Sequence, residues 1–230
     1  MHSEVLWFQV AGARRSTQRN LRMIDPATLI TYVAVVFGFV FIPGPATLLT
    51  VARATSSGTK VGIATGAGVA AGDVIHTIMA IVGISAIIAA SAMLFSIVKY
   101  IGAAYLVYLG IRAILEKAPA GLAGRTLPIS AGKAFRQAIL TEVLNPKTAL
   151  FFLAFLPQFV HPQGGFVMLQ LMLLGIIFVL FGLFSTIVFA VSAGGLGSFL
   201  RRNPAVLKWQ GKVVGGIYCA LGIRLALQQR

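Results

Sequence analysis

One acidic residue interrupts a long apolar segment and could carry ion or substrate chemistry there. Asp73 is the only charged residue of the segment 61–90, and His76 follows it by three positions. Residues three apart share a helix face, so these two side chains are expected together. A lone carboxylate in an apolar helix is costly and usually faces water or a polar partner. We therefore interpret Asp73 as a proton carrier in a transport pathway; the alternative is a structural hydrogen-bond cluster between helices.

A second group of candidate residues surrounds a proline in the segment 134–159. The proline removes a helix hydrogen bond and leaves backbone groups without partners. The lysine beside it could pair with Asp73 or with a substrate carboxylate. The alternative is that the acid and the lysine of this group extend to the cytoplasmic interface. The group consists of Glu142, Asn145, Pro146 and Lys147.

The first apolar segment, 29–51, contains a stronger break of the same kind, formed by Pro43, Gly44 and Pro45. Two prolines around a glycine leave several amides and carbonyls unpaired at membrane depth. Such groups are tolerated where they line a cavity, and there they bind ions or zwitterions. A simple kink is the alternative. Discontinuous helices at matching positions of two halves predict a central binding site.

Six apolar segments are long enough to position these residues across a membrane, since a spanning helix needs about 20 residues. The segments are continuous rather than alternating, which excludes spanning strands. We therefore predict an all-α integral membrane fold with six transmembrane helices, the first and fourth broken at their prolines. The predicted spans are residues 29–51, 61–90, 94–114, 134–159, 166–193 and 206–227.

Composition supports a membrane protein, because only 10% of the residues are charged and a soluble domain carries about a quarter. The mean hydropathy is +0.91. The net charge of +14 comes from basic residues in short gaps between the apolar segments. This pattern indicates loops facing the cytoplasm and anionic lipid, and argues against a nucleic-acid partner. Counting the basic residues places the loops after the first, third and fifth spans inside, and both termini outside.

Other residues limit the alternatives. The single cysteine, Cys219, excludes an internal disulfide and a thiol–disulfide carrier. We find no Ser/His/Asp arrangement, phosphate loop or metal-ligand cluster, and predict no enzyme activity and no cofactor. Four aromatic residues are interpreted as ordinary packing or interface aromatics. They are Tyr100, Tyr105, Trp209 and Tyr218.

Two sequence motifs recur in the same order roughly a hundred residues apart. Residues 109–112 (Leu-Gly-Ile-Arg) return at 221–224, and the proline motif at 43–48 matches the one at 145–150. Three spans is an odd number, so a second copy must insert upside down. We predict two inverted three-helix repeats, which are typical of transporters. They cover about 27–115 and 134–228 within a transporter domain, 23–230.

Residues 1–22 lie before this domain and place an apolar patch ahead of a basic cluster. A secretory signal has the opposite order. We interpret the segment as a disordered or interfacial arm, or as an artefact of an upstream start, since Met23 begins a natural first span.

Four motifs together resemble the LysE/RhtB family of amino-acid exporters. They are Phe-Ile-Pro-Gly-Pro at 41–45, Gly72-Asp73, the Gly-Ala-Ala-Tyr-Leu-containing segment 102–110, and Asn-Pro-Lys with two phenylalanines at 145–152. The resemblance extends from Met23 to Leu227. It implies export of amino acids or close relatives from the bacterial cytoplasm, driven by the proton or ion gradient, and it does not fix the substrate. By position it implies functional roles for Pro43, Gly44, Pro45, Asp73, Asn145, Pro146 and Lys147.

The sequence thus predicts a multi-pass secondary transporter of the bacterial cytoplasmic membrane that exports an amino acid in exchange for protons. Asp73 would exchange protons, while Lys147 and exposed backbone amides would hold the substrate carboxylate. A homodimer is left open. The alternative is a small-cation or metal exporter, or a channel, of the same superfamily; the interior offers at most two acids, near an opposing lysine. The predicted pathway residues are Pro43, Gly44, Pro45, Asp73, His76, Glu142, Asn145, Pro146 and Lys147.

Overall fold

The computed structural model describes residues 24–41, 44–90, 92–115, 128–161, 164–202 and 204–227. All regular structure in these ranges is helical. The predicted arm at 1–22 and Pro43 lie outside the described residues. The helices are α2 (Pro26–Phe41), α3 (Pro45–Ser57), α4 (Thr59–Ala90), α5 (Ala92–Leu115), α6 (Ala131–Val143), α7 (Pro146–Leu150), a π-helix (Phe151–Phe155), a 3₁₀ helix (Leu156–Phe159), α8 (Val167–Arg202) and α9 (Pro204–Leu227).

Local signals place the ends of the short helices. The Asp25 carboxylate accepts hydrogen bonds from the backbone N–H groups of Ala27 and Thr28, at 3.1 and 3.3 Å, and so caps α2. At the other end of the first predicted span, α3 stops at Gly58, whose φ of 93° suits a residue without a side chain. The first span is therefore bounded by a cap and a glycine, with the break inside it.

Both predicted breaks are present. The axes of α2 and α3 differ in direction by 48°, and that of α6 differs by 47° from the helical segment Pro146–Phe159. The second break follows from Pro146, which has no N–H to continue α6. The backbone N–H of Asn145 closes the preceding turn on the Glu142 carbonyl at 2.9 Å. The chain then restarts as α7.

Length and composition mark the membrane-crossing segments. Within the described residues, α4 over Thr59–Ile84 and α8 over Val167–Ala193 are each long and apolar enough to cross a membrane. Counting each bent pair as one span raises the number to four. The helices α5 and α9 correspond to the predicted third and sixth spans, which stay predictions.

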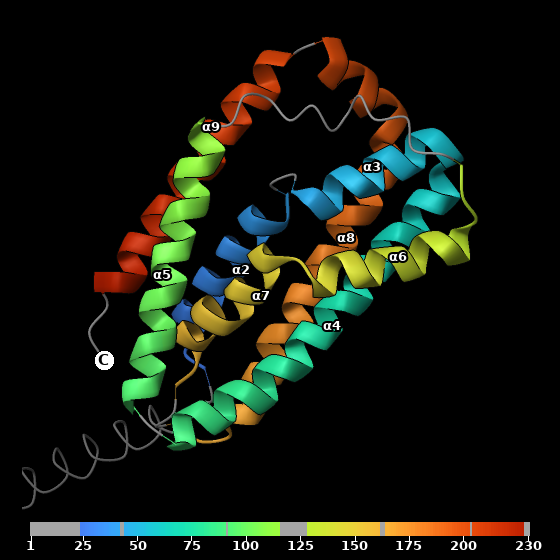
Figure 1. Cartoon of the computed structure of the whole chain (residues 1–230). Coiled ribbons are helices and arrows are strands. Elements are labelled where there is room, and N and C mark those ends of the chain that lie inside the picture. The colour runs from blue at the N-terminus through green and yellow to red at the C-terminus, as the bar shows by residue number, and fades with distance from the viewer. Residues whose placement is uncertain are drawn as a thin grey trace, which may run out of the picture.

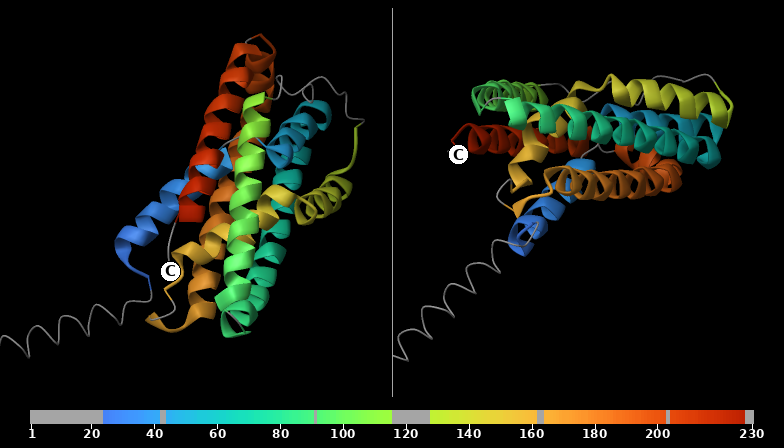
Figure 2. Two further views of the ribbon diagram at one scale, coloured as in Figure 1. Left: turned by 60° about the vertical axis from the view of Figure 1, so that its left-hand side comes forward. Right: turned by 90° about the horizontal axis from the view of Figure 1, so that it is seen from below.

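The helices are arranged in antiparallel partners (Figure 1). Helix α4 runs beside α8 in the opposite direction, and α5 runs beside α9 in the opposite direction. The two bent pairs also run in opposite directions, α2 to α3 one way and α6 to α7 the other. The α3–α4 turn and the α8–α9 junction lie at one end of the bundle, and the α4–α5 junction lies at the other (Figures 1 and 2).

An aromatic core fills the bundle beside the breaks. The ring of Phe151, on the π-helix, has its centre 4.6 Å from that of Phe39 on α2 and 4.7 Å from that of Phe178 on α8. Tyr32 is fully buried, and its hydroxyl donates to the Leu174 carbonyl at 2.8 Å. This core joins α2, the π-helix and α8, and so fixes the first break relative to the second.

Candidate functional site

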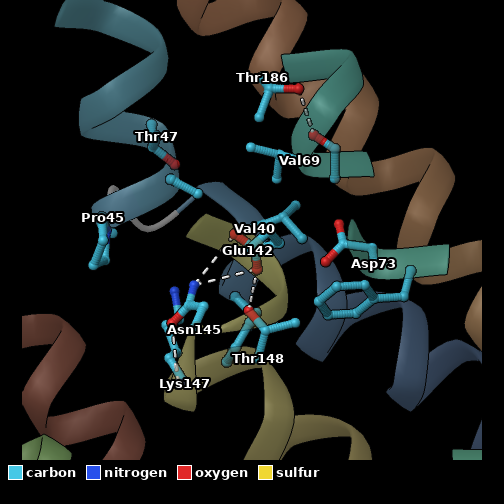
Figure 3. Close-up of a pocket in the computed structure, with 15 residues that line it drawn as sticks. Val40, Pro45, Thr47, Val69, Asp73, Glu142, Asn145, Lys147, Thr148 and Thr186 are labelled. Carbon is cyan, nitrogen blue, oxygen red and sulfur yellow. Dashed lines mark hydrogen bonds between the residues drawn. The ribbon is translucent and has the colours of Figure 1, made fainter. Parts of the chain in front are cut away.

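A cavity lies where the two breaks meet α4 and α8 (Figure 3). Together with its mouth it contains about 430 Å³ not filled by protein atoms. Of the nine pathway residues predicted from the sequence, six line this one cavity. These six are Gly44, Pro45, Asp73, Glu142, Asn145 and Lys147.

Asp73 lines the cavity with a carboxylate whose Oδ1 atom has no hydrogen-bond partner among the described residues. Its side chain on α4 is only 2% exposed, and Figure 3 shows the carboxylate apart from the hydrogen-bonded group around Glu142. The Oδ1 atom is buried and has no hydrogen-bond partner among the residues that the structure describes. A Cβ at Gly182 of α8 would lie 3.1 Å from Oδ2, so the glycine leaves room for the carboxylate. A buried acceptor without a donor is suited to receive a proton or a substrate cation.

Glu142, at the end of α6, has a carboxylate that already accepts hydrogen bonds, unlike that of Asp73. The Thr148 hydroxyl donates to Oε1, and the Asn145 side-chain amide lies 3.2 and 3.3 Å from the two carboxylate oxygens. A Cβ at Gly72 of α4 would lie 2.6 Å from the Glu142 Cβ, which shows how closely the helices approach. The side chain is buried. The alternative that Glu142 extends to an interface is therefore wrong.

Lys147 connects the second break to the first. The Asn145 side-chain oxygen accepts the Lys147 backbone N–H at 3.1 Å and caps α7. The ammonium Nζ lies 4.1 Å from the centre of the Phe39 ring and 5.6 Å from that of Tyr218. A Cβ on Gly44 would lie 3.2 Å from the same Nζ. The cation therefore stands against the bare backbone of the first break.

The beginning of α3 adds a second source of positive potential. Gly44 is the N-cap residue and offers no side-chain cap, and Pro45 occupies the first helical position. The next N–H groups of a helix have no partner within it and carry the positive end of the helix dipole. Pro45, Ala46 and Thr47 line the cavity. The site thus combines a helix N-terminus with an ammonium at one side and a free carboxylate at the other.

Of the three other predicted residues, His76 and Pro146 do not line the cavity. His76 is buried, with Nε2 2.9 Å from the Glu142 carbonyl oxygen and its ring stacked on Phe152 at 5.7 Å. Pro146 starts α7 with an exposed side chain. Pro43 lies outside the described residues. His76 shares the α4 face of Asp73 as expected, yet it holds α6 in place rather than facing the cavity.

Several other residues that line the cavity were not predicted from the sequence. Two of them carried a usable signal: Thr47 and Thr148 each stand two positions after a proline of a helix break, Pro45 and Pro146. Others had none, because they come from apolar stretches of other helices. They include Phe39, Val69, Phe178 and Thr186.

Chemically, the cavity suits a small zwitterion. An anionic group would meet Lys147 and the first turn of α3, and a cationic group would meet Asp73. Because Glu142 is already bonded on both oxygens, it adds less attraction for a second cation. Within the described residues, no three His, Cys, Asp or Glu side chains are grouped so as to hold a metal ion.

Comparison with known proteins gives matches along most of the chain. An "Uncharacterized membrane protein" of Vibrio cholerae is 30% identical over 203 residues, which are 88% of this chain and 98% of that protein. The "Uncharacterized membrane protein YrhP" of Bacillus subtilis is 31% identical, over 87% of this chain and 99% of that protein. No solved structure matches.

Leucine efflux proteins, whose name states a transport activity, are among the relatives. A "Leucine efflux protein" of Salmonella typhimurium is 34% identical over 131 residues, which are 56% of this chain and 62% of that protein. The family model described as LysE type translocator matches residues 36–229, which include both helix breaks and every residue of the cavity. The chain therefore belongs to the LysE type translocator family.

Proposed function

We propose that this translocator exports amino acids or close derivatives from the cytoplasm in exchange for protons, as a secondary transporter of the bacterial cytoplasmic membrane. The observation that carries the proposal is the Asp73 carboxylate, which is buried against the cavity with Oδ1 unpartnered among the described residues. Amino-acid export is supported by the similarity to a leucine efflux protein. The lining of the cavity supports a zwitterionic substrate.

Coupling follows from competition at one carboxylate. Asp73 accepts either a proton or the α-ammonium group of the substrate, because each satisfies the same buried acceptor. The site cannot hold the proton and the substrate together. It therefore exchanges one for the other as it faces the two sides of the membrane in turn. Glu142 is a poor candidate for this exchange, since Asn145 and Thr148 already donate to it.

The substrate carboxylate would be held at the opposite side of the cavity. Lys147 supplies a full charge, and the free N–H groups at the start of α3 supply directed donors. Both breaks then contribute to one end of the substrate. In this arrangement the discontinuous helices bind the substrate carboxylate, which a simple kink would not do.

Alternating access would come from two inverted repeats of three helices, with α5 and α9 as the third and sixth spans. The opposite directions of α4 and α8, of α5 and α9, and of the two bent pairs support this (Figure 1). Rocking of one repeat against the other would expose the cavity to each side in turn. The basic loops would face the cytoplasm and both termini the outside.

Vesicles containing the purified protein test the coupling. With an imposed pH gradient, labelled leucine should move against its own gradient in the wild type. Asp73→Asn should leave leucine flux indifferent to the pH gradient, whereas Glu142→Gln should keep the response. Full gradient-driven flux in the Asp73→Asn variant would exclude the proton role.

A thermal-shift screen tests the substrate class. Amino acids should raise the melting temperature of the purified protein, and salts of mono- and divalent cations should not. Stabilisation by metal salts alone would favour the cation-exporter alternative.

Orientation can be tested with single cysteines in a Cys219→Ser background. Ser130 precedes α6 and Phe166 precedes α8, and both side chains are exposed. A membrane-impermeant thiol reagent added to intact cells should label Phe166→Cys and spare Ser130→Cys. The reverse pattern would place the termini inside.

A further inference from the structure

A tyrosine on α9 has a buried hydroxyl that nothing in the described residues explains. Tyr218 is 5% exposed, and its hydroxyl oxygen is buried without a hydrogen-bond partner among the described residues. Burying a phenol unpaired is unfavourable, because the group loses water and gains no partner. The Tyr218 hydroxyl adds little to packing, since a phenylalanine ring would fill the same space.

The tyrosine does not itself line the cavity, but it lies next to Lys147, which does. Its ring centre is 5.6 Å from Lys147 Nζ and 6.0 Å from the centre of the Phe39 ring. These three side chains come from α9, α7 and α2, which are separate in the sequence. The unpaired hydroxyl therefore belongs to the ring that Lys147 contacts. Lys147 is the only lysine among the described residues that line the cavity.

We propose that Tyr218 is a substrate-binding residue whose hydroxyl donates a hydrogen bond to the carboxylate of the exported molecule, beside Lys147. The inference rests on the proposed function, because it needs a carboxylate substrate. A carboxylate has two oxygens, so one can accept from the ammonium while the other accepts from the phenol. A hydrogen bond from a phenol to an ionised carboxylate is short and strong, and it supplies the acceptor that the hydroxyl lacks.

This role also gives α9 a function. Helix α9 packs mainly on α5, beside the α4–α8 pair rather than within it (Figure 2). Through Tyr218, a bound substrate would contact the third helix of the second repeat as well as both breaks. Binding would then draw α9 toward α2 and α7.

The test compares Tyr218→Phe with wild type in vesicles. The substitution keeps the ring beside Phe39 and Lys147 and removes only the hydroxyl. We expect the KM for leucine to rise about ten- to hundredfold, the loss typical of one hydrogen bond to a charged group. The melting temperature without substrate should stay equal or rise, because an unpaired buried group is gone. The matched control is Tyr105→Phe on α5, whose ring packs against Tyr108, and it should leave the KM unchanged.

A substrate analogue separates carboxylate recognition from packing. Leucinamide lacks the ionised carboxylate, so its inhibition constant should be equal for wild type and Tyr218→Phe. Tyr218→Leu, which removes ring and hydroxyl together, should raise the KM for leucine at least as much as the phenylalanine variant.

The outcomes are distinct. An unchanged KM for leucine in folded Tyr218→Phe, or an equal change for leucinamide, overturns the role of Tyr218 and leaves amino-acid export intact. A wild-type protein that moves none of the amino acids overturns both proposals.

Discussion

The two helix breaks bend their spans by almost the same angle, 48° and 47°, yet they bring different chemistry to the cavity. The first break, before α3, presents bare backbone. The second, before α7, presents side chains. The comparison shows that one motif, repeated in two halves, can supply the directed donors in one copy and the charges in the other.

The first break depends on other helices for its hydrogen bonds. Gly44 has no side chain to cap α3, and the N-cap position makes no side-chain hydrogen bond. The last turn of α2 is satisfied from α8, where the Ser185 hydroxyl donates to the Val40 carbonyl at 2.8 Å. Because Gly44 supplies no side-chain cap, the N–H groups at the start of α3 stay available to a ligand.

The second break is satisfied mostly from within, with one contact from outside, between His76 of α4 and the Glu142 carbonyl. Asn145 caps α7 with its side-chain oxygen and donates to Glu142 with its side-chain nitrogen. Thr148, one residue after Lys147, donates to the same carboxylate. This closed network fixes the position of the Lys147 backbone and leaves its ammonium to reach the first break. The second break is thus the rigid one, and the first is the open one.

Removing the charge of the second break should have the largest effect. Lys147→Met keeps the length and the apolar contact with Phe39 but removes the only cation of the cavity lining. We expect leucine transport at low concentration to fall about a hundredfold or more, as for loss of one partner of a buried charged pair. Lys133→Met, at an exposed position in the first turn of α6, is the control and should transport normally. Near-normal transport by Lys147→Met would mean that the carboxylate is held elsewhere.

Opening the network of the second break should lower stability. Asn145→Ala removes the cap of α7 and one donor to Glu142 together. The expected loss is about 1–3 kcal/mol of folding free energy, measured as a lower melting temperature in detergent. Asp25→Ala removes only a cap, that of α2, and should lower it less. Equal effects would show that the link to Glu142 adds nothing.

Much of this contrast could be predicted from the sequence, because prolines act locally. Pro146 ends α6 in any surroundings, and Asn145 before it is a common cap. Asp73 stood out because one charge in an apolar run needs a partner or a pathway. The repeat motifs placed the two breaks in matching positions.

The sequence could not show which groups meet across the breaks. Thr148 is six residues after Glu142, a spacing that would not bring them together on a continuous helix. Only the bend at Asn145 does so. The π-helix at Phe151–Phe155 lies in a purely apolar stretch, where no residue type signals it. Contacts of Lys147 with α2 and α9 depend on packing that no local pattern encodes.

The matched threonines offer a direct comparison of the two breaks. Thr148→Val removes a donor to the buried Glu142 carboxylate, so we expect a loss of about 1–2 kcal/mol in stability. Thr47→Val, likewise two positions after a proline of the first break, should change the melting temperature little and raise the KM about threefold, since Thr47 lines the cavity. The contrast fails if both variants lose the same stability.

The smallest change tests whether the first break must stay bare. Gly44 has φ −111° and ψ −171°, an extended conformation that alanine also adopts, so Gly44→Ala should fold normally. Its Cβ would lie 3.2 Å from Lys147 Nζ, which forces the ammonium to shift by a few tenths of an ångström. We expect the KM for leucine to rise about fivefold, because the cation and the α3 N-terminus no longer converge on one carboxylate. Gly132→Ala on α6, where a Cβ would meet nothing within 4 Å, is the control. If Gly44→Ala transports with an unchanged KM, the two breaks act independently, and the substrate carboxylate is held by Lys147 without the backbone of α3.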